Sequence, residues 1–352
     1  MGPSLLRPIL VRAASLGAVL IIVLFLMVMI LGLTGFSDTI LKAQVGEELR
    51  ALRTGLAETI TDPDAVEEII ATRRTELEAS YGLDQAWYER LPAVVARVLV
   101  FDLGDARDIR AADGSNNVGD IILERLPRTM MLLTTSLLIT AAISLTLGVY
   151  LSTRPGSRLD RIVSWFAAIT NGLPSWWAGI MLILILSIWL RILPDGGMFS
   201  TPPPEGFIPT LLDLARHALL PVATLVLVSV GPSIYVTRTM TLDVAFQDHV
   251  TVARAKGLPE GIVRRRHILR VAAPPLVTGL ILGLAASLSG AILIETVFGW
   301  EGMGLLYFKT FTGQPDESII IGLTFMYTLI YVGARLLLEV LYVFLDPRVR
   351  YE

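Results

Sequence analysis

The chain of 352 residues contains no cysteine and only three histidines. Without cysteine it can form no disulfide, no thiolate metal site and no cysteine nucleophile. His217, His249 and His267 are far apart along the chain, so a histidine-based metal cluster is not expected either. Charged residues amount to only 17% and the net charge is −3, so the chain lacks the overall positive field that attracts nucleic acids.

Sequence motifs that carry catalysis are also missing. There is no glycine-rich phosphate loop that ends in Lys-Ser or Lys-Thr, and there is no His-Glu-x-x-His zinc motif. The serines and the three histidines show no spacing that indicates a nucleophile and its base. The sequence therefore predicts that this chain is not an enzyme and holds no cofactor or metal of its own.

Long apolar runs are what the chain has in abundance, since 53% of its residues are hydrophobic. A bilayer core of about 30 Å requires roughly 20 apolar residues per helix. Six stretches meet this requirement, at about residues 10–33, 129–152, 172–193, 217–240, 272–297 and 318–345. The first is too long for the core of a signal peptide and no cleavage site follows it, so it is expected to stay as a span. The sequence predicts an all-α polytopic membrane protein with six transmembrane helices and an interfacial helix from about residue 160.

Lysine and arginine in the short connectors predict the orientation of these helices. Three arginines lie in the connector 153–163, and six further cations lie in the connector 241–270. The connectors on the opposite side carry acidic residues and a single Lys309. Because cytoplasmic connectors are enriched in Lys and Arg, both cationic connectors and both chain termini are predicted to be cytoplasmic, in a multi-pass protein of the cell membrane.

This topology divides the chain into three parts. Residues 1–33 form the cytoplasmic N-terminus and the first span, residues 34–128 lie outside, and residues 129–352 form a core with five spans and the connector 241–270. The outer segment has a helix start at Asp62 and Pro63 and a helix stop at Gly82. We therefore expect a small, mainly helical extracytoplasmic domain rather than a linker.

The connector 241–270 contains the stretch "TVARAKGLPEGIVRRRHILR" at residues 251–270, which has two explanations. The arginines at 264–266 and 270 abut a span, and their position there is accounted for by the bias of positive charge toward the cytoplasm. The front half instead predicts a short helix with the small residues Ala253 and Ala255, ended at Gly257 and followed by Leu258 as an apolar anchor. A short helix that stands away from the bilayer is suited to docking into a partner's groove.

Small and polar residues inside the spans also have two explanations each. Gly279, Gly283, Ser287 and Gly290 fall on one face of the fifth span, which we call the glycine face. This face either packs closely against another helix or forms the smooth wall of a solute path. Glu295, near the end of the same span, either caps a chain reversal or lines the path. In the sixth span, Arg335 and Glu339 are four residues apart and are expected to neutralise each other.

The connector resembles the coupling loop of binding-protein-dependent ABC import permeases. That loop has the pattern Glu-Ala-Ala, three residues, Gly, nine residues, Ile-x-Leu-Pro. Aligned here are Thr251-Val252-Ala253, Gly257 and His267-Ile268-Leu269-Arg270, of which the second alanine, the glycine and the leucine match. The Glu, the first Ala, the Ile and the Pro of the pattern are replaced.

Further motifs are similar to the dipeptide/oligopeptide/nickel branch of this family and cover roughly residues 81–352. They are "YGLDQAWYERL", "FDLGDARDI", "ILERLPRTMML", "RLDRIVSW", "GLPSWWAGIMLIL", "ARAKGL", "RHILR", "GAILIETVFGWEGMGLL" and "LYVFLDPRVR". Residues 37–80 are longer than the family leads us to expect.

The resemblance implies the type I permease fold of ABC importers and a set of partners. These are a second, homologous permease, two cytoplasmic ATPases that hold ATP and Mg, and an extracytoplasmic solute-binding protein. The coupling residues would be Ala253, Arg254, Ala255, Lys256, Gly257 and Leu258, which would enter an ATPase cleft. The path would be lined by the glycine face and Glu295. Dipeptides and oligopeptides are the expected solutes, with nickel chelates or oligosaccharides as the alternative, while a non-transporting membrane scaffold is an alternative of another class.

Overall fold

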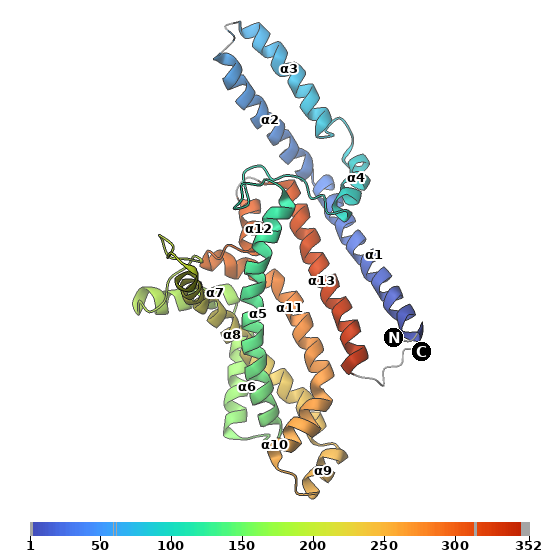
Figure 1. Cartoon of the computed structure of the whole chain (residues 1–352), viewed down its shortest axis with the longest axis vertical. Coiled ribbons are helices and arrows are strands. Elements are labelled where there is room, and N and C mark those ends of the chain that lie inside the picture. The colour runs from blue at the N-terminus through green and yellow to red at the C-terminus, as the bar shows by residue number, and fades with distance from the viewer. Residues whose placement is uncertain (1–2, 59, 61, 313–314, 346–352) are drawn as a thin grey trace. The chain divides into compact units, whose positions relative to one another are not determined.

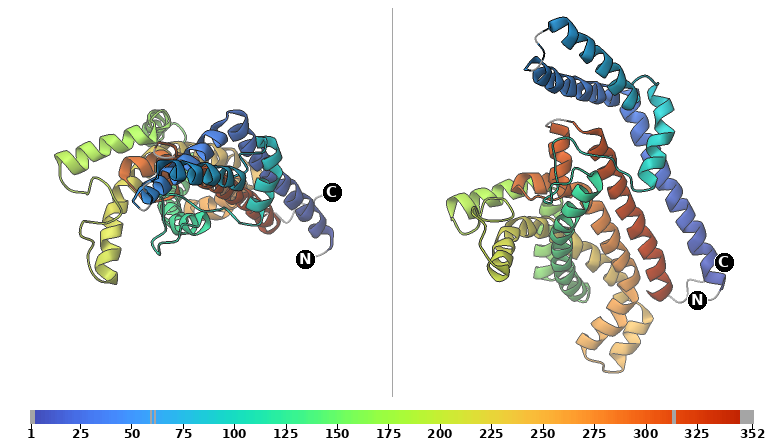
Figure 2. Two further views of the ribbon diagram at one scale, coloured as in Figure 1. Left: turned by 90° about the horizontal axis from the view of Figure 1, so that it is seen from above. Right: turned by 45° about the horizontal axis from the view of Figure 1, so that its top comes forward.

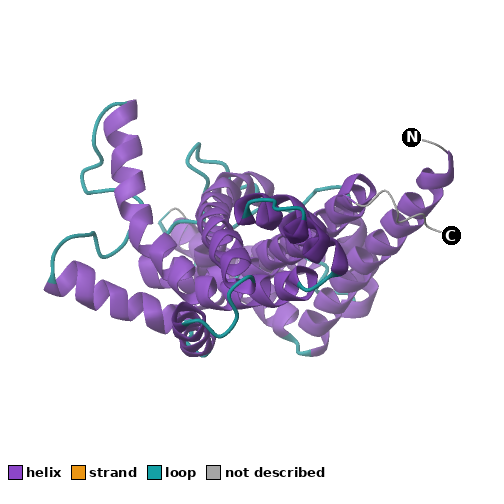
Figure 3. Cartoon of the chain, turned by 90° about the horizontal axis from the view of Figure 1, so that it is seen from below, coloured by secondary structure: helices purple, strands orange, loops and turns teal. Residues whose placement is uncertain are grey.

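The computed structural model describes residues 3–58, 60, 62–312 and 315–345 of the chain. Over these residues it contains helices and loops but no strand, apart from an isolated bridge between Asp105 and Asn117 (Figure 3). The predicted all-α class is therefore confirmed. The closing motif "LYVFLDPRVR" lies partly outside the described residues.

The chain divides into two compact units. Its helices are labelled in Figure 1. Unit 1 comprises Met1–Arg12, Arg125–Phe308 and Ile330–Glu352, and unit 2 comprises Ala13–Glu124 and Lys309–Leu329. The first helices are α1 (Pro3–Leu33), α2 (Phe36–Ala57), α3 (Pro63–Ser80), α4 (Trp87–Leu99) and α5 (Val118–Ser152). Next come α6 (Arg158–Asn171), α7 (Ser175–Leu182), the π-helical η1 (Ile183–Trp189) and α8 (Phe207–Ala245). The last are α9 (Asp248–Ala255), α10 (Glu260–Ile262), the π-helical η2 (Val263–Leu269), α11 (Arg270–Phe298), α12 (Met303–Thr312) and α13 (Glu317–Leu345).

Within the part of the chain that the structure describes, five helical segments are long and apolar enough to cross a membrane, namely Leu10–Leu33, Val118–Ser152, Phe207–Ala245, Glu260–Ala285 and Glu317–Leu341. Two further helix pairs are apolar enough together but are sharply bent. One pair, Arg158–Asn171 with Ser175–Trp189, bends by 101°, and the other, Ala291–Phe298 with Met303–Thr312, bends by 82°. The chain is thus a multi-pass membrane protein.

The third predicted span corresponds to α7 and η1, which run without a break from Ser175 to Trp189, and α6 lies before it at the place of the predicted interfacial helix. The chain breaks between Asn171 and Ser175, and the two helical parts bend by 101°. Pro174 has extended backbone angles immediately before α7 and cannot continue α6. The apolar count found the segment but did not give the angle of this bend.

Unit 2 contains the helix that the sequence predicts most clearly. The Asp62 side chain accepts a hydrogen bond from the N–H of Asp64 at 3.1 Å, Pro63 occupies the first helical position, and α3 runs to Ser80. Gly82 follows with a φ of 67°, a left-handed conformation that favours glycine. The helices α2 and α3 pack side by side in opposite directions (Figures 1 and 2). Their shared core consists of Val45, Leu49, Val66, Ile70 and Leu77.

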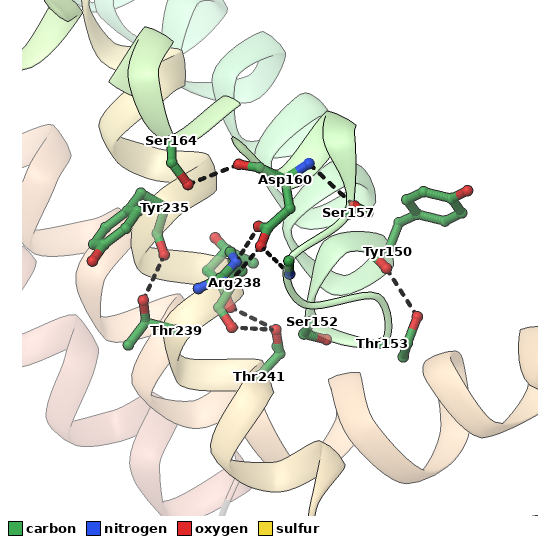
Figure 4. A network of polar contacts seen from close by, with 12 residues as sticks. Tyr150, Ser152, Thr153, Ser157, Asp160, Ser164, Tyr235, Arg238, Thr239 and Thr241 are labelled. Atoms are coloured by element: carbon green, nitrogen blue, oxygen red, sulfur yellow. Dashed lines mark hydrogen bonds and ion pairs between the residues drawn. The ribbon is translucent and has the colours of Figure 1, made fainter. Parts of the chain in front are cut away.

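In unit 1, α6 is fixed to α8 by a buried ion pair. The Asp160 carboxylate is only 4% exposed and accepts hydrogen bonds from the guanidinium of Arg238 on α8 and from the N–H of Gly156 at 2.9 Å (Figure 4). Gly231 of α8 lies so close to α6 that an added Cβ would be 2.9 Å from the Cα of Ala167. A charge pair and a close backbone approach therefore make α6 and α8 one rigid body.

Candidate functional site

The connector between α8 and α11 folds into a small unit with its own apolar core. In Figures 1 and 2, α9 and α10 lie together at one end of α11. The core joins the connector to the ends of α5, α8 and α11 through Val149, Val244, Ala245, Val250, Ala253, Val263, Ile268, Ala272 and Leu276. Since Val250, Val263 and Ile268 are completely buried, the connector is held firmly by three long helices.

The end of α9 is a Schellman motif. Gly257 has a φ of 73°, and its N–H donates to the carbonyl of Arg254 at 2.9 Å. The N–H of Leu258 donates to the carbonyl of Ala253 at 3.4 Å. These are the two bonds that define this helix end, and they require a residue that tolerates the left-handed conformation. Pro259 then prevents the helix from continuing.

The structure separates the predicted coupling residues into exposed and buried ones. Ala255, Lys256 and Gly257 are exposed, and we call them the tip. Ala253 is only 3% exposed, and Leu258 packs partly against the same apolar core. The small side chain of Ala253 is therefore not available for docking, and Leu258 packs partly inward instead of projecting as an anchor, so both expectations are corrected.

Arg254 and the rear arginines make contacts that the sequence did not reveal. Arg254 donates to the Glu260 carboxylate at 2.8 Å across the Gly-Leu-Pro turn. The guanidinium groups of Arg264 and Arg154 lie over the ring of Tyr150, at 5.3 Å and 4.8 Å from its centroid. Tyr150 belongs to α5, so this stacking adds a polar link between η2 and α5. The opposite charges of Arg254 and Glu260, six residues apart, are a sequence signal for their ion pair. No sequence signal indicates the contact of the arginines with Tyr150.

The glycine face of α11 is open where it is described. Gly279 and Gly283 are exposed, and a Cβ added at either position would meet nothing within 4 Å. Ser287 is half-buried and its hydroxyl donates to the carbonyl of Leu284 at 2.7 Å. The structure describes Gly290 only as part of α11. Close packing within the chain is therefore not what Gly279 and Gly283 serve.

Glu295 closes a chain reversal. Its side chain is completely buried and accepts hydrogen bonds from the Thr129 hydroxyl at 2.7 Å and from the N–H groups of Gly304 and Leu305 at 2.7 Å and 3.1 Å. It therefore caps the first turn of α12 and ties it to α5. Of the two explanations for Glu295, path lining and the cap, the geometry supports the cap.

The last span also differs from expectation. The Glu339 carboxylate pairs with Arg12 of α1 at 2.7 Å instead of with Arg335, so the ion pair joins two helices rather than two turns of one helix. Among the residues that the structure describes, no group of three His, Asp or Glu side chains is placed to hold a metal ion.

Comparison with known proteins identifies the family. Residues 144–351, more than half of the chain, match the family described as "Binding-protein-dependent transport system inner membrane component". The chain belongs to this family. The matched range includes the whole connector, α11 and the Asp160–Arg238 pair. It is thus a transport permease component of the inner-membrane type, as the coupling-loop motif implied.

Three relatives show how far the similarity extends. The oligopeptide transport system permease protein AppB of Bacillus subtilis is 28% identical over 92% of this chain and 95% of its own length. A putative peptide permease protein of Brucella suis is 31% identical over 92% of this chain and 95% of its own length. The dipeptide transport system permease protein DppB of Escherichia coli K12 is 27% identical over 80% of this chain and 86% of its own length. The similarity therefore includes unit 2 as well as the permease core.

Proposed function

We propose that this chain is the transmembrane permease subunit of an ATP-driven importer of dipeptides and oligopeptides. It forms the path together with a second, homologous permease, and an extracytoplasmic binding protein delivers the peptide. Two cytoplasmic ATPase subunits bind ATP and Mg and drive alternating access. The names of the relatives, all peptide permeases, support the choice of solute.

The arrangement of the connector is the observation that carries the proposal. Its tip of Ala255, Lys256 and Gly257 is exposed, while the residues directly behind it are buried in a core shared with α5, α8 and α11. A push on the tip is therefore passed to three long helices instead of being absorbed by a flexible loop. This is what a lever between an ATPase and a set of spans requires.

The orientation follows from charge. The connectors with Arg154, Arg158 and Arg161 and with the cations of 241–270 face the cytoplasm, where the ATPases are, and both termini lie on that side. Residues 34–128 then lie outside, where the binding protein arrives. The exposed Gly279 and Gly283 of α11 are the residues that we assign to the path between the two permeases.

Reconstitution of the complete importer in vesicles tests this function. The substitution Ala255→Arg adds a long charged side chain at the exposed tip without entering the core, so peptide uptake and peptide-stimulated ATP hydrolysis are expected to fall together. Arg265→Lys is the matched control, because Arg265 is exposed and its charge is kept. Full coupling in Ala255→Arg would contradict the role of the tip. Uptake of a nickel chelate or an oligosaccharide in place of peptides would contradict the assigned solute.

A further inference from the structure

Unit 2 contains a cavity of about 770 Å³ that the permease function does not use. It is lined by α1, α2, the end of α3, α4, the loop that leads to α5, and the beginning of α13. Small-molecule sites in proteins usually have volumes of about 300–1,000 Å³. The cavity is therefore of a size that suits a small solute, and its polar lining indicates which kind.

Two arginines of this cavity have buried donors that find no acceptor among the described residues. Arg90 donates from Nη2 to Asp38, but its Nε and Nη1 are buried and have no partner among the described residues. Arg107 donates from Nη2 to the carbonyl of Ile40 at 3.1 Å, whereas its buried Nε has no partner among those residues. Burial also lowers the pKa of Arg107 from its ordinary value. A buried charged donor without an acceptor is costly.

The groups that would satisfy these donors are known from their chemistry. A guanidinium binds a carboxylate through charge-assisted, often paired, hydrogen bonds. Arg97 lines the same cavity and is exposed, so a carboxylate that enters from solvent passes a third guanidinium. The lining thus contains three guanidinium groups that suit an anion.

Other parts of the lining suit a cation. The Oε1 atom of Gln44 is buried and accepts no hydrogen bond from the described residues, so it requires a donor. Glu47, Asp105 and Asp108 are exposed acidic residues of the same lining, and Glu47 and Asp108 are near enough to Arg107 to act against the lowering of its pKa. Glu48 lines the cavity too, and it accepts a hydrogen bond from the Tyr81 hydroxyl at 2.5 Å. Groups of both signs in one cavity favour a ligand that carries both charges.

We propose that this cavity binds a short free peptide, with its terminal carboxylate at Arg90 and its ammonium group toward Gln44 and the acidic residues. The charges alone assign the class of small zwitterions, and the choice of a peptide within that class rests on the proposed function. Such a site gives the permease a peptide contact of its own, in addition to the binding protein.

Calorimetry on the purified full-length chain, in phosphatidylglycerol nanodiscs and without its partners, tests the proposal. Alanyl-alanine is expected to bind in a saturable manner with one site per chain. N-acetyl-alanyl-alanine and alanyl-alanine amide each lack one charge and should bind about tenfold or more weakly. Glycerophosphoethanolamine is the second zwitterion to test, since its phosphate could also reach the arginines. If it binds and alanyl-alanine does not, the site is one for lipid headgroups and the proposal is overturned.

Arginine variants connect this binding to the cavity. Arg90→Gln should weaken the binding of alanyl-alanine about tenfold to hundredfold, because a charged hydrogen-bonding partner is lost. Arg97→Gln should weaken the binding of alanyl-alanine less than Arg90→Gln. Because Arg97 is exposed, it can be replaced without loss of fold, so the Arg97→Gln variant tests the site if Arg90→Gln does not fold. Arg50→Gln is the matched control on α2, exposed and outside the cavity lining. Unchanged affinity in both cavity variants would overturn the proposal.

The site and the proposed function fail in different ways. If the assembled importer takes up peptides but the isolated chain binds no alanyl-alanine at millimolar concentration, the cavity site is wrong and the transport function stands. If the chain binds the dipeptide but the importer moves no peptide, the transport function is wrong and the site stands.

Discussion

Gly257 offers the sharpest test of how the connector works. Its φ of 73° lies in the left-handed region, yet a Cβ added there would meet nothing within 4 Å. The cost of a side chain is therefore one of backbone conformation and not of space. For an L-residue that cost is about 1–2 kcal/mol, which reduces the population of the native helix end about fivefold to thirtyfold. Asparagine tolerates this region best among the other residues, so it should cost less than alanine despite its size.

The assay is peptide-stimulated ATP hydrolysis by the reconstituted importer. We expect coupling to decrease in the order Gly257, Gly257→Asn, Gly257→Ala, Gly257→Val. The matched control is Gly261→Ala in α10, where the backbone is helical and a Cβ also meets nothing, so coupling should be unchanged. If coupling instead decreased with side-chain size, with alanine better than asparagine, the tip would be limited by its fit to the ATPase and our conformational argument would be refuted.

Three further predictions concern unit 1. Glu295→Ala should lower the free energy of unfolding by about 1–3 kcal/mol or more, because it leaves the N–H groups of Gly304 and Leu305 buried without an acceptor. Denaturant unfolding in detergent measures this change. Glu295→Gln keeps an acceptor and should lower the free energy of unfolding less. Asp160→Ala should cost about 3–5 kcal/mol in the same assay, since it leaves the Arg238 charge without its partner, whereas replacement of the exposed Arg161 by alanine should have little effect. Gly283→Cys introduces a single thiol into a chain that has none. If Gly283 lines the path, a water-soluble maleimide should label this thiol in a complex with cysteine-free partners. Failure to label it would show that the position is packed against a partner helix.

Local sequence signals predicted the elements that depend on local interactions. Asp62, Pro63 and Gly82 define α3 because capping, a fixed φ and a left-handed residue act within a few positions of the chain. The apolar spans follow from length and hydropathy for the same reason. By contrast, the 101° bend between α6 and α7 is not a property of hydropathy, and Pro174 shows only that a helix ends there.

The site itself depended on contacts between distant residues. Two alanines in a short helix look alike in the sequence, and only the core contributed by α5, α8 and α11 turns Ala253 inward and leaves Ala255 outside. The partners of Glu295 include Thr129, which is 166 positions away in the chain. The sequence therefore located the connector and the cap but could not assign an inner and an outer side to them.

The surroundings of the glycines show where the chain is complete and where it leaves room for other subunits. Gly148 and Gly231 belong to closed contacts, since an added Cβ would lie 2.7 Å from the Thr237 side chain at Gly148 and 2.9 Å from the Cα of Ala167 at Gly231. They allow α5, α6 and α8 to approach one another within unit 1. Gly279 and Gly283 have the same small size but open surroundings. A small residue with nothing beside it gains no packing energy within its own chain, and in the middle of a helix it costs about 1 kcal/mol relative to alanine. Under the proposed function, these two open glycines lie on the surface that the second permease completes, which gives their small size a role that the isolated chain does not provide.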